Sequence, residues 1–291
     1  MHAIPDSLCY LNGEFSPLRD AKVSVLDRGF LFGDGIYEVM PVYGRRLFRF
    51  DQHLARLEHG LGKIRIGNPL GHSQWLSHCR ALVAAHPSDD QLIYIQVTRG
   101  VAPRDHAMPT DIAPTVFIMT NPLKSPTPEE RHAGVACTTA RDFRWERGDL
   151  KSISLLGNVL ARQLSVDQGT AETILFRDGF LTEASGSNVW VAHEGALLGP
   201  PKSDHLLEGI RYELLRELCE EEGIAFNLRP ITEAEVLSAD EVMLSATSKE
   251  VLPVTSIDGE SVGHGALRGK PGPLYARIHA AYQRAKASQS I

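Results

Sequence analysis

The sequence predicts an α+β protein with two domains. Segments with strand and helix patterns are mixed in both halves of the chain without regular alternation, which disfavours a doubly wound parallel sheet. Turn pairs such as Asp178-Gly179 stand between short apolar runs, and this arrangement predicts antiparallel hairpins. The 291 residues lie near the limit of roughly 250–300 residues at which single hydrophobic cores stop growing, so we expect two cores.

Residues 1–120 are expected to form the smaller, N-terminal α+β domain. Asn12-Gly13 is a turn pair, and Asp51 is placed to cap a helix whose leucines recur at helical spacing. The expected elements, in order, are strands at 9–11 and 21–25, a hairpin of 36–43 with 46–50, helices at 51–64 and 73–85, and strands at 92–98 and 115–120.

Residues 121–130, NPLKSPTPEE, are rich in proline and polar side chains and are predicted to link the domains. An ordinary surface loop within one domain would have the same composition. Residues 131–291 are then expected to form the larger C-terminal domain. Its expected elements are a strand at 135–139, a helix at 155–168, hairpins of 172–176 with 180–183 and 188–192 with 196–198, helices at 206–222 and 233–238, a strand at 241–245 and a helix at 274–286.

Composition excludes several classes of function. The formal net charge of -6 provides no basic surface for phosphate backbones, so a nucleic-acid partner is not expected. No apolar run reaches the roughly 18 residues that a membrane helix needs, and residues 1–15 lack the pattern of a signal peptide. The four cysteines stand far apart in no metal-ligand spacing, so we expect free thiols, no metal site and a cytoplasmic protein.

Two segments about thirty residues apart suggest a chemistry. Residues 149–163, DLKSISLLGNVLARQ, place Lys151 just ahead of a predicted helix, and residues 181–190, LTEASGSNVW, place Glu183 among small residues. Pyridoxal phosphate needs an amine to form a Schiff base with its aldehyde and an acid to keep its pyridine nitrogen protonated. Taken alone, Lys151 would more often be a charged helix end and Glu183 a surface carboxylate. Most of the other lysines have polar or turn-forming neighbours and are expected to be solvated.

Together with the glycine-rich residues 28–39, RGFLFGDGIYEV, these segments resemble the fold type IV (class IV) pyridoxal-phosphate-dependent aminotransferases. The resemblance extends from Leu11 to about Asp258. It implies the two-domain architecture of that family, Lys151 as the catalytic and cofactor-bearing lysine, and Glu183 as the partner of the pyridine nitrogen. Asn188 is expected to support the loop that follows Glu183.

The resemblance also implies which residues hold the cofactor's phosphate and ring. Arg56 stands at the arginine of an H-x-x-R-L motif, and a guanidinium can grip phosphate with two hydrogen bonds. Relatives often carry threonine where Arg211 stands, so its backbone amide is the expected contact, and a family threonine falls on Ala246 or on Thr247, of which we assign Thr247. The implied cofactor-binding set is Lys151, Glu183, Arg56, Leu207, Gly209, Ile210, Arg211 and Thr247.

Residues 97–109, VTRGVAPRDHAMP, resemble the branch of the family that acts on D-amino acids. There an Arg-x-His pair and a tyrosine bind the substrate's α-carboxylate, and these roles fall on Arg104, His106 and Tyr37. In relatives this loop reaches in from the neighbouring subunit, which implies a homodimer. The alternative interpretation is that Arg104 and His106 belong to an ordinary polar surface loop and bind no substrate.

The resulting hypothesis is a transaminase that moves the amino group of a D-amino acid, such as D-alanine or D-glutamate, to a 2-oxo acid in two half-reactions. A branched-chain L-amino acid transaminase and an aminodeoxychorismate lyase of the same family are the alternatives. A non-catalytic binding protein with this fold is disfavoured because both Lys151 and Glu183 are present. The sequence leaves open the preferred donor and acceptor, the pathway, and any assembly beyond a dimer.

Overall fold

The protein consists of two compact units in the computed structural model, which describes residues 7–291. The first unit contains the described residues up to Leu123 together with Leu150–Leu155 and Gln289–Ile291, and the second contains Lys124–Asp149 and Leu156–Ser288. The chain leaves the first unit within the segment 121–130 expected to link the domains. The start of the N-terminal segment examined for a signal peptide, residues 1–6, lies outside the described residues.

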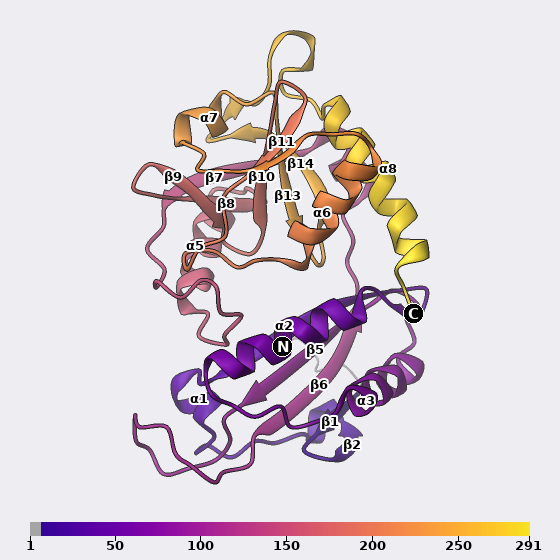
Figure 1. Ribbon diagram of the computed structural model, residues 1–291, viewed down its shortest axis with the longest axis vertical. Coiled ribbons are helices and arrows are strands. Elements are labelled where there is room, and N and C mark those ends of the chain that lie inside the picture. The colour runs from indigo at the N-terminus through magenta and orange to yellow at the C-terminus, as the bar shows by residue number, and fades with distance from the viewer. Residues whose placement is uncertain (1–6) are drawn as a thin grey trace. The chain divides into compact units, whose positions relative to one another are not determined.

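The first unit is a six-stranded antiparallel sheet with two helices packed on it (Figure 1). The strands follow the spatial order β2-β1-β6-β5-β3-β4. Its elements are β1 (Leu8–Leu11), β2 (Glu14–Pro17), η1 (Leu18–Asp20), α1 (Arg28–Phe32), β3 (Gly35–Tyr43), β4 (Arg46–Leu47), α2 (Phe50–Lys63), α3 (His72–Ala85), β5 (Gln91–Thr98) and β6 (Thr115–Pro122). Both long helices bury an apolar face in the core of the sheet, through Leu57 on α2 and Trp75 on α3.

The first unit differs from the sequence prediction in several details. Helix α1 is absent from that prediction, and the strand expected at 46–50 ends at Leu47. The strand expected at 21–25 lies earlier, at β2 (Glu14–Pro17). Asn12 and Gly13 both take positive φ angles and form a two-residue turn, so β2 pairs with β1 directly after them. The helix expected to be capped by Asp51 begins at Phe50, since Arg49 adopts a left-handed conformation and occupies the cap position.

The second unit contains a nine-stranded mixed sheet, ordered β12-β11-β10-β13-β14-β7-β8-β9 with β15 beside β14. Its elements are α4 (Pro128–Ala133), β7 (Val135–Arg141), α5 (Leu156–Asp167), β8 (Glu172–Arg177), β9 (Phe180–Ala184), β10 (Asn188–His193), β11 (Ala196–Gly199), α6 (Ile210–Glu221), β12 (Phe226–Leu228), α7 (Glu233–Leu237), β13 (Glu241–Ala246), β14 (Glu250–Ile257), β15 (Glu260–Ser261), η2 (Gly265–Leu267) and α8 (Pro273–Ser288). The mixture of helices with antiparallel and parallel strand pairs confirms the predicted α+β class.

Strand β14 lies in the middle of this sheet and is absent from the sequence prediction, because Pro253 interrupts its apolar run. Its partner β7 begins only opposite Val254, so the missing amide of Pro253 removes no hydrogen bond on that side. Helix α6 begins at Ile210 rather than at 206, because the residues before it are extended up to the cap residue Gly209.

The range 131–291 is expected from the sequence to carry Lys151. In the structure, Leu150–Leu155 groups with the first unit because its backbone pairs with β3. No helix within residues 7–291 has the length and apolar character needed to cross a membrane.

Candidate active site

The lysine segment is held by the edge of β3 in the first unit. The Tyr37 amide donates to the Lys151 carbonyl at 2.9 Å, and the Ile153 amide donates to the Gly35 carbonyl at 3.1 Å. Ile36 and Ser152 form the antiparallel bridge between these two hydrogen bonds. Backbone pairing therefore places Lys151 beside Tyr37, although the two residues are far apart in the sequence.

Two glycines of the segment 28–39 make this close approach possible. Gly33 ends α1 in a left-handed conformation with φ of 67°, and a Cβ there would lie 2.4 Å from Ser154 Oγ. A Cβ on Gly35 would lie 2.6 Å from the Val97 carbonyl oxygen and 3.1 Å from Ile153 Cδ1. Any side chain would push the lysine segment or β5 away, so the glycine-rich string serves to seat Lys151.

The Lys151 ammonium lies over an aromatic ring. Its Nζ is 4.2 Å from the centroid of the Tyr37 ring, which stacks on Tyr94 with 5.7 Å between centroids. Burial, and then the nearby Tyr37, raise the pKa of Tyr94 to about 12. Within residues 7–291 no carboxylate pairs with Lys151 Nζ. The Tyr37 ring therefore orients the Lys151 side chain through a cation–π contact.

Arg56, predicted to hold phosphate, lies on α2 and forms two hydrogen bonds with a buried carboxylate. Its Nε and Nη2 donate to the two oxygens of Glu38 at 2.8 and 2.6 Å, and His53 Nδ1 lies 3.0 Å from Glu38 Oε1. Burial alone would raise the pKa of Glu38, but Arg56 and His53 outweigh it and hold the pKa well below its usual range. Glu38 thus fixes the orientation of the Arg56 guanidinium.

The loop that carries Arg104 and His106 is anchored from inside the first unit. The buried Arg28 donates from Nη1 to the Asp105 carbonyl at 2.5 Å, while its Nε donates to Asp34 at 2.8 Å. Both predicted substrate residues pack on the Phe32 ring, 5.4 Å away in each case. The structure therefore gathers Arg104 and His106 at the end of α1, whereas Tyr37 contacts Lys151 and Tyr94.

In the second unit, Glu183 on β9 is nearly inaccessible, with 6% of its surface exposed. Its Oε1 accepts a hydrogen bond from Arg144 Nη1 at 2.5 Å. Its Oε2 accepts from the Leu207 amide at 3.2 Å and from Asn188 Nδ2 at 3.3 Å. A carboxylate has about four acceptor positions, so these three donors leave one for a further donor.

Arg144 is the residue at this site that sequence reasoning missed. Asp142 binds its guanidinium through two hydrogen bonds, at 3.0 and 2.9 Å, and Thr182 donates to the same carboxylate at 2.9 Å. Burial raises the pKa of Glu183, and although Arg144 works against this, the pKa is about 7. Asp142 and Arg144 lie in a short irregular stretch without periodicity, so no local pattern marked them.

The predicted phosphate residues at the start of α6 are positioned by Asn188. Asn188 Nδ2 also donates to the Leu207 carbonyl at 2.9 Å. A Cβ on Gly209 would lie 2.3 Å from Asn188 Oδ1, so only glycine fits there. Gly209 caps α6 without a side-chain hydrogen bond. The amino end of a helix favours an anion, and the hydrogen bonds of Asn188 to Glu183 and Leu207 match the supporting role expected of it.

The side chain of Arg211 points away from this helix start. Its guanidinium is buried, and Nη2 donates to the Tyr282 hydroxyl on α8 at 2.8 Å. The guanidinium is therefore engaged with α8, and the phosphate contact expected of Arg211 remains that of its backbone amide. Thr247 lies in the tight turn between β13 and β14. Near the end of β13, Ser245 pairs with Asn188 at the start of β10. The sheet register thereby brings this turn to the same end of β10 as Asn188.

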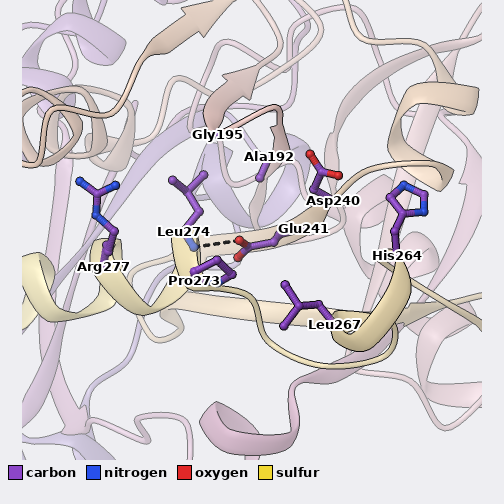
Figure 2. Close-up of a pocket in the computed structure, with 9 residues that line it drawn as sticks. All are labelled: Ala192, Gly195, Asp240, Glu241, His264, Leu267, Pro273, Leu274 and Arg277. Carbon is purple, nitrogen blue, oxygen red and sulfur yellow. Dashed lines mark hydrogen bonds between the residues drawn. The ribbon is translucent and has the colours of Figure 1, made fainter.

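A cavity of about 340 Å³ in the second unit is separate from these residues. It lies by Ala192 and Glu241, at the opposite end of the β10–β13 pair from Asn188 and Ser245. Its polar groups already have partners within the chain: Figure 2 shows the Glu241 carboxylate turned to the Leu274 amide, which donates at 2.8 Å. Among residues 7–291 no group of three or more His, Cys, Asp or Glu side chains could hold a metal ion.

Comparison with solved structures defines the class of fold. The Escherichia coli branched-chain amino acid aminotransferase superimposes with a TM-score of 0.88 at 24% identity, covering 96% of this chain and 94% of that one. A branched-chain aminotransferase from Thermoproteus uzoniensis with norvaline gives 0.84 at 23% identity, with coverage of 97% and 95%. A fold IV-transaminase from Curtobacterium pusillum gives 0.78 at 20% identity, with 92% of each chain covered. At such identities the likeness shows the fold alone.

The sequence comparisons then identify the family. The profile of the family described as "Amino-transferase class IV" matches residues 35–257, and the chain belongs to that family of enzymes. A D-alanine aminotransferase of Bacillus licheniformis is 39% identical over 279 residues, which cover 96% of this chain and 97% of the relative. A D-alanine aminotransferase of Staphylococcus haemolyticus is 36% identical over 282 residues, covering 97% and 98%.

Proposed function

We propose that the protein transfers the amino group of a D-amino acid to a 2-oxo acid with pyridoxal phosphate as cofactor. The observation that carries the proposal is identity of 36–39% over nearly the whole chain to relatives named D-alanine aminotransferase. The surroundings of Lys151 and Glu183 support it, because Lys151 Nζ lies over the Tyr37 ring and Glu183 is a buried acceptor.

The described residues fit the requirements of this cofactor. Glu183 keeps one acceptor position inside a buried network, which suits a protonated pyridine nitrogen. The amino end of α6, which begins after Gly209, suits a phosphate. Arg56 and Thr247 are proposed as further phosphate contacts, and Leu207 as a contact of the ring.

When bound, pyridoxal phosphate delocalises the electron pair that is left when the donor loses its α-proton. Lys151 Nζ would hold the cofactor covalently at rest and, once freed by the incoming amine, would take the α-proton and hold it. The Tyr37 ring and the backbone pairing with β3 keep this amine in one place. Arg144, itself held by Asp142, keeps the Glu183 carboxylate in a fixed orientation.

Arg104, His106 and Tyr37 are proposed to bind the α-carboxylate and so to select the D-enantiomer. The guanidinium fork matches a carboxylate, and Arg28 with Asp34 holds the loop firmly enough to present it. We propose that the loop serves the neighbouring subunit of a homodimer. The four cysteines are all buried free thiols, which agrees with the reducing cytoplasm as the proposed compartment.

A panel of amino donors tests the proposal. D-alanine and L-leucine are offered separately with 2-oxoglutarate while the cofactor spectrum is recorded, and turnover with D-alanine alone is expected. Turnover with L-leucine alone would establish the branched-chain alternative and refute D-specificity. Release of pyruvate from aminodeoxychorismate without an amino acceptor would identify a lyase instead.

A further inference from the structure

The Lys249 side chain is only 23% exposed, although its polar surroundings in the sequence suggest a solvated residue. It lies two residues beyond Thr247 in the turn between β13 and β14, and its Nζ donates to Glu172 Oε2 at 2.8 Å. The same Nζ donates to Ser187 Oγ at 3.0 Å. Glu172 is completely buried at the start of β8, so the pair joins an accessible turn to the core of the sheet.

Glu172 also holds the turn that follows Glu183. The hydroxyl groups of Ser185 and Ser187 both donate to its carboxylate, the second at 2.9 Å. The turn is closed by the Ala184 amide, which donates to the Ser187 carbonyl at 2.7 Å. One carboxylate therefore fastens both the segment 184–188 and, through Lys249, the turn 247–249.

Both segments lie at residues proposed to hold the cofactor. Glu183 directly precedes the first segment, which ends at its supporting residue Asn188, and Thr247 stands in the second. We propose that Glu172 and Lys249 form a positioning pair that sets the distance between the pyridine partner and the phosphate turn. The inference rests on the proposed function, because it concerns the same cofactor.

Stability alone is a weak reason for such a pair. A buried ion pair costs desolvation of both charges, and a well-packed apolar pair of similar volume is often equally stable. Burial would raise the pKa of Glu172, but Lys249 and the two serines outweigh it and lower the pKa. The carboxylate is thus charged and saturated with donors, as a fixed anchor for two loops must be.

The test measures cofactor binding rather than turnover. Pyridoxamine 5'-phosphate is the probe, since it lacks the aldehyde and cannot bond to Lys151, and equilibrium dialysis against the full-length protein gives its dissociation constant. Lys249→Met is expected to raise that constant by about tenfold, as loss of a supporting partner commonly does. Lys249→Arg keeps the charge and is expected to stay within about threefold. The exposed Lys270 provides the control, because Lys270→Met should change nothing.

A double variant separates positioning from stability. Glu172→Gln with Lys249→Met leaves no unpaired buried charge, so its Tm is expected to recover toward that of the wild type while the dissociation constant stays raised. The inference would be overturned if both the Tm and the dissociation constant of the double variant returned to wild-type values. It would also be overturned if Lys249→Met bound the probe as tightly as the wild type, or if Lys249→Arg and Lys249→Met lost equal affinity. If Lys249→Met does not fold, the affinity of the double variant decides alone.

The outcome also separates this inference from the proposed function. Failure of the wild-type protein to bind pyridoxamine 5'-phosphate would remove the proposed function together with the inference. Normal binding by the wild type and by every variant would leave the proposed function intact and remove only the positioning role of Lys249.

Discussion

Tyr37 holds Lys151 in two ways. Its backbone amide donates to the Lys151 carbonyl at 2.9 Å, and its ring centroid lies 4.2 Å from the ammonium of the same lysine. The backbone contact fixes where the lysine segment lies, and the ring contact fixes where the side chain points. Orientation of this kind suits an amine that forms a covalent bond and transfers a proton at a defined place.

Replacing this amine should abolish the reaction. Lys151→Ala is expected to lower turnover of D-alanine with 2-oxoglutarate by at least about 10²-fold, because the variant loses the acid–base group. The absorbance of the lysine-bound cofactor should vanish with it. Lys22→Ala, at an exposed position of the same unit, is the control. Persistence of both the turnover and the absorbance would refute the role of Lys151.

The glycine at position 35 offers a test of how the lysine is seated. A Cβ there would lie 2.6 Å from the Val97 carbonyl oxygen, so Gly35→Ala is expected to destabilise the protein by about 1–3 kcal/mol and to reduce activity. Gly62→Ala is a matched control, since nothing lies within 4 Å of its Cβ position in α2, and it should stabilise by about 0.5–1 kcal/mol. Thermal unfolding gives both values, and equal stability of the two variants would contradict the packing argument.

Glu183 should make the cofactor-free protein less stable as the pH rises. Its pKa is about 7 in the folded state against 4.5 for a free glutamate, so the folded state binds the proton more tightly. The contribution of Glu183 to the free energy of unfolding is therefore fully present below pH 4.5. It is lost as the pH rises toward 7, and the loss is at most about 3 kcal/mol. Urea unfolding at pH 5 and pH 8 measures this loss.

The matching variant is Glu183→Gln, which cannot titrate and should show a smaller difference between the two pH values. An identical pH dependence in wild type and variant would mean that Glu183 does not hold its proton more tightly when folded. In the presence of cofactor, the same variant should lose activity because an amide cannot keep the pyridine nitrogen protonated.

Arg104 is the residue on which D-specificity depends. Arg104→Ala is expected to raise KM for D-alanine by about 10- to 100-fold, which corresponds to the free energy of a hydrogen bond to a charged group. The cofactor spectrum should not change. Arg80→Ala, at an exposed position on α3, controls for loss of surface charge. Steady-state kinetics supply the measurement, and an unaltered KM would exclude Arg104 from carboxylate binding.

Much of the fold could be predicted from the sequence, because turns and helices depend on neighbouring residues. Asp178-Gly179 predicts the hairpin of β8 and β9, and both residues take the positive φ angles of such a turn. Strand β14 escapes prediction because Pro253 disrupts the local pattern, and only the sheet shows why it is tolerated.

The sequence by itself determined the α+β class, the family and the identities of Lys151 and Glu183, since short strings of residues carry that information. Only the tertiary structure decided that Lys151 belongs with β3, that Arg144 pairs with Glu183, and that Lys249 pairs with Glu172. These partners lie far apart along the chain or in irregular segments. Their pairing follows from sheet register and from the need of buried charges for partners, and neither leaves a periodic trace in the sequence.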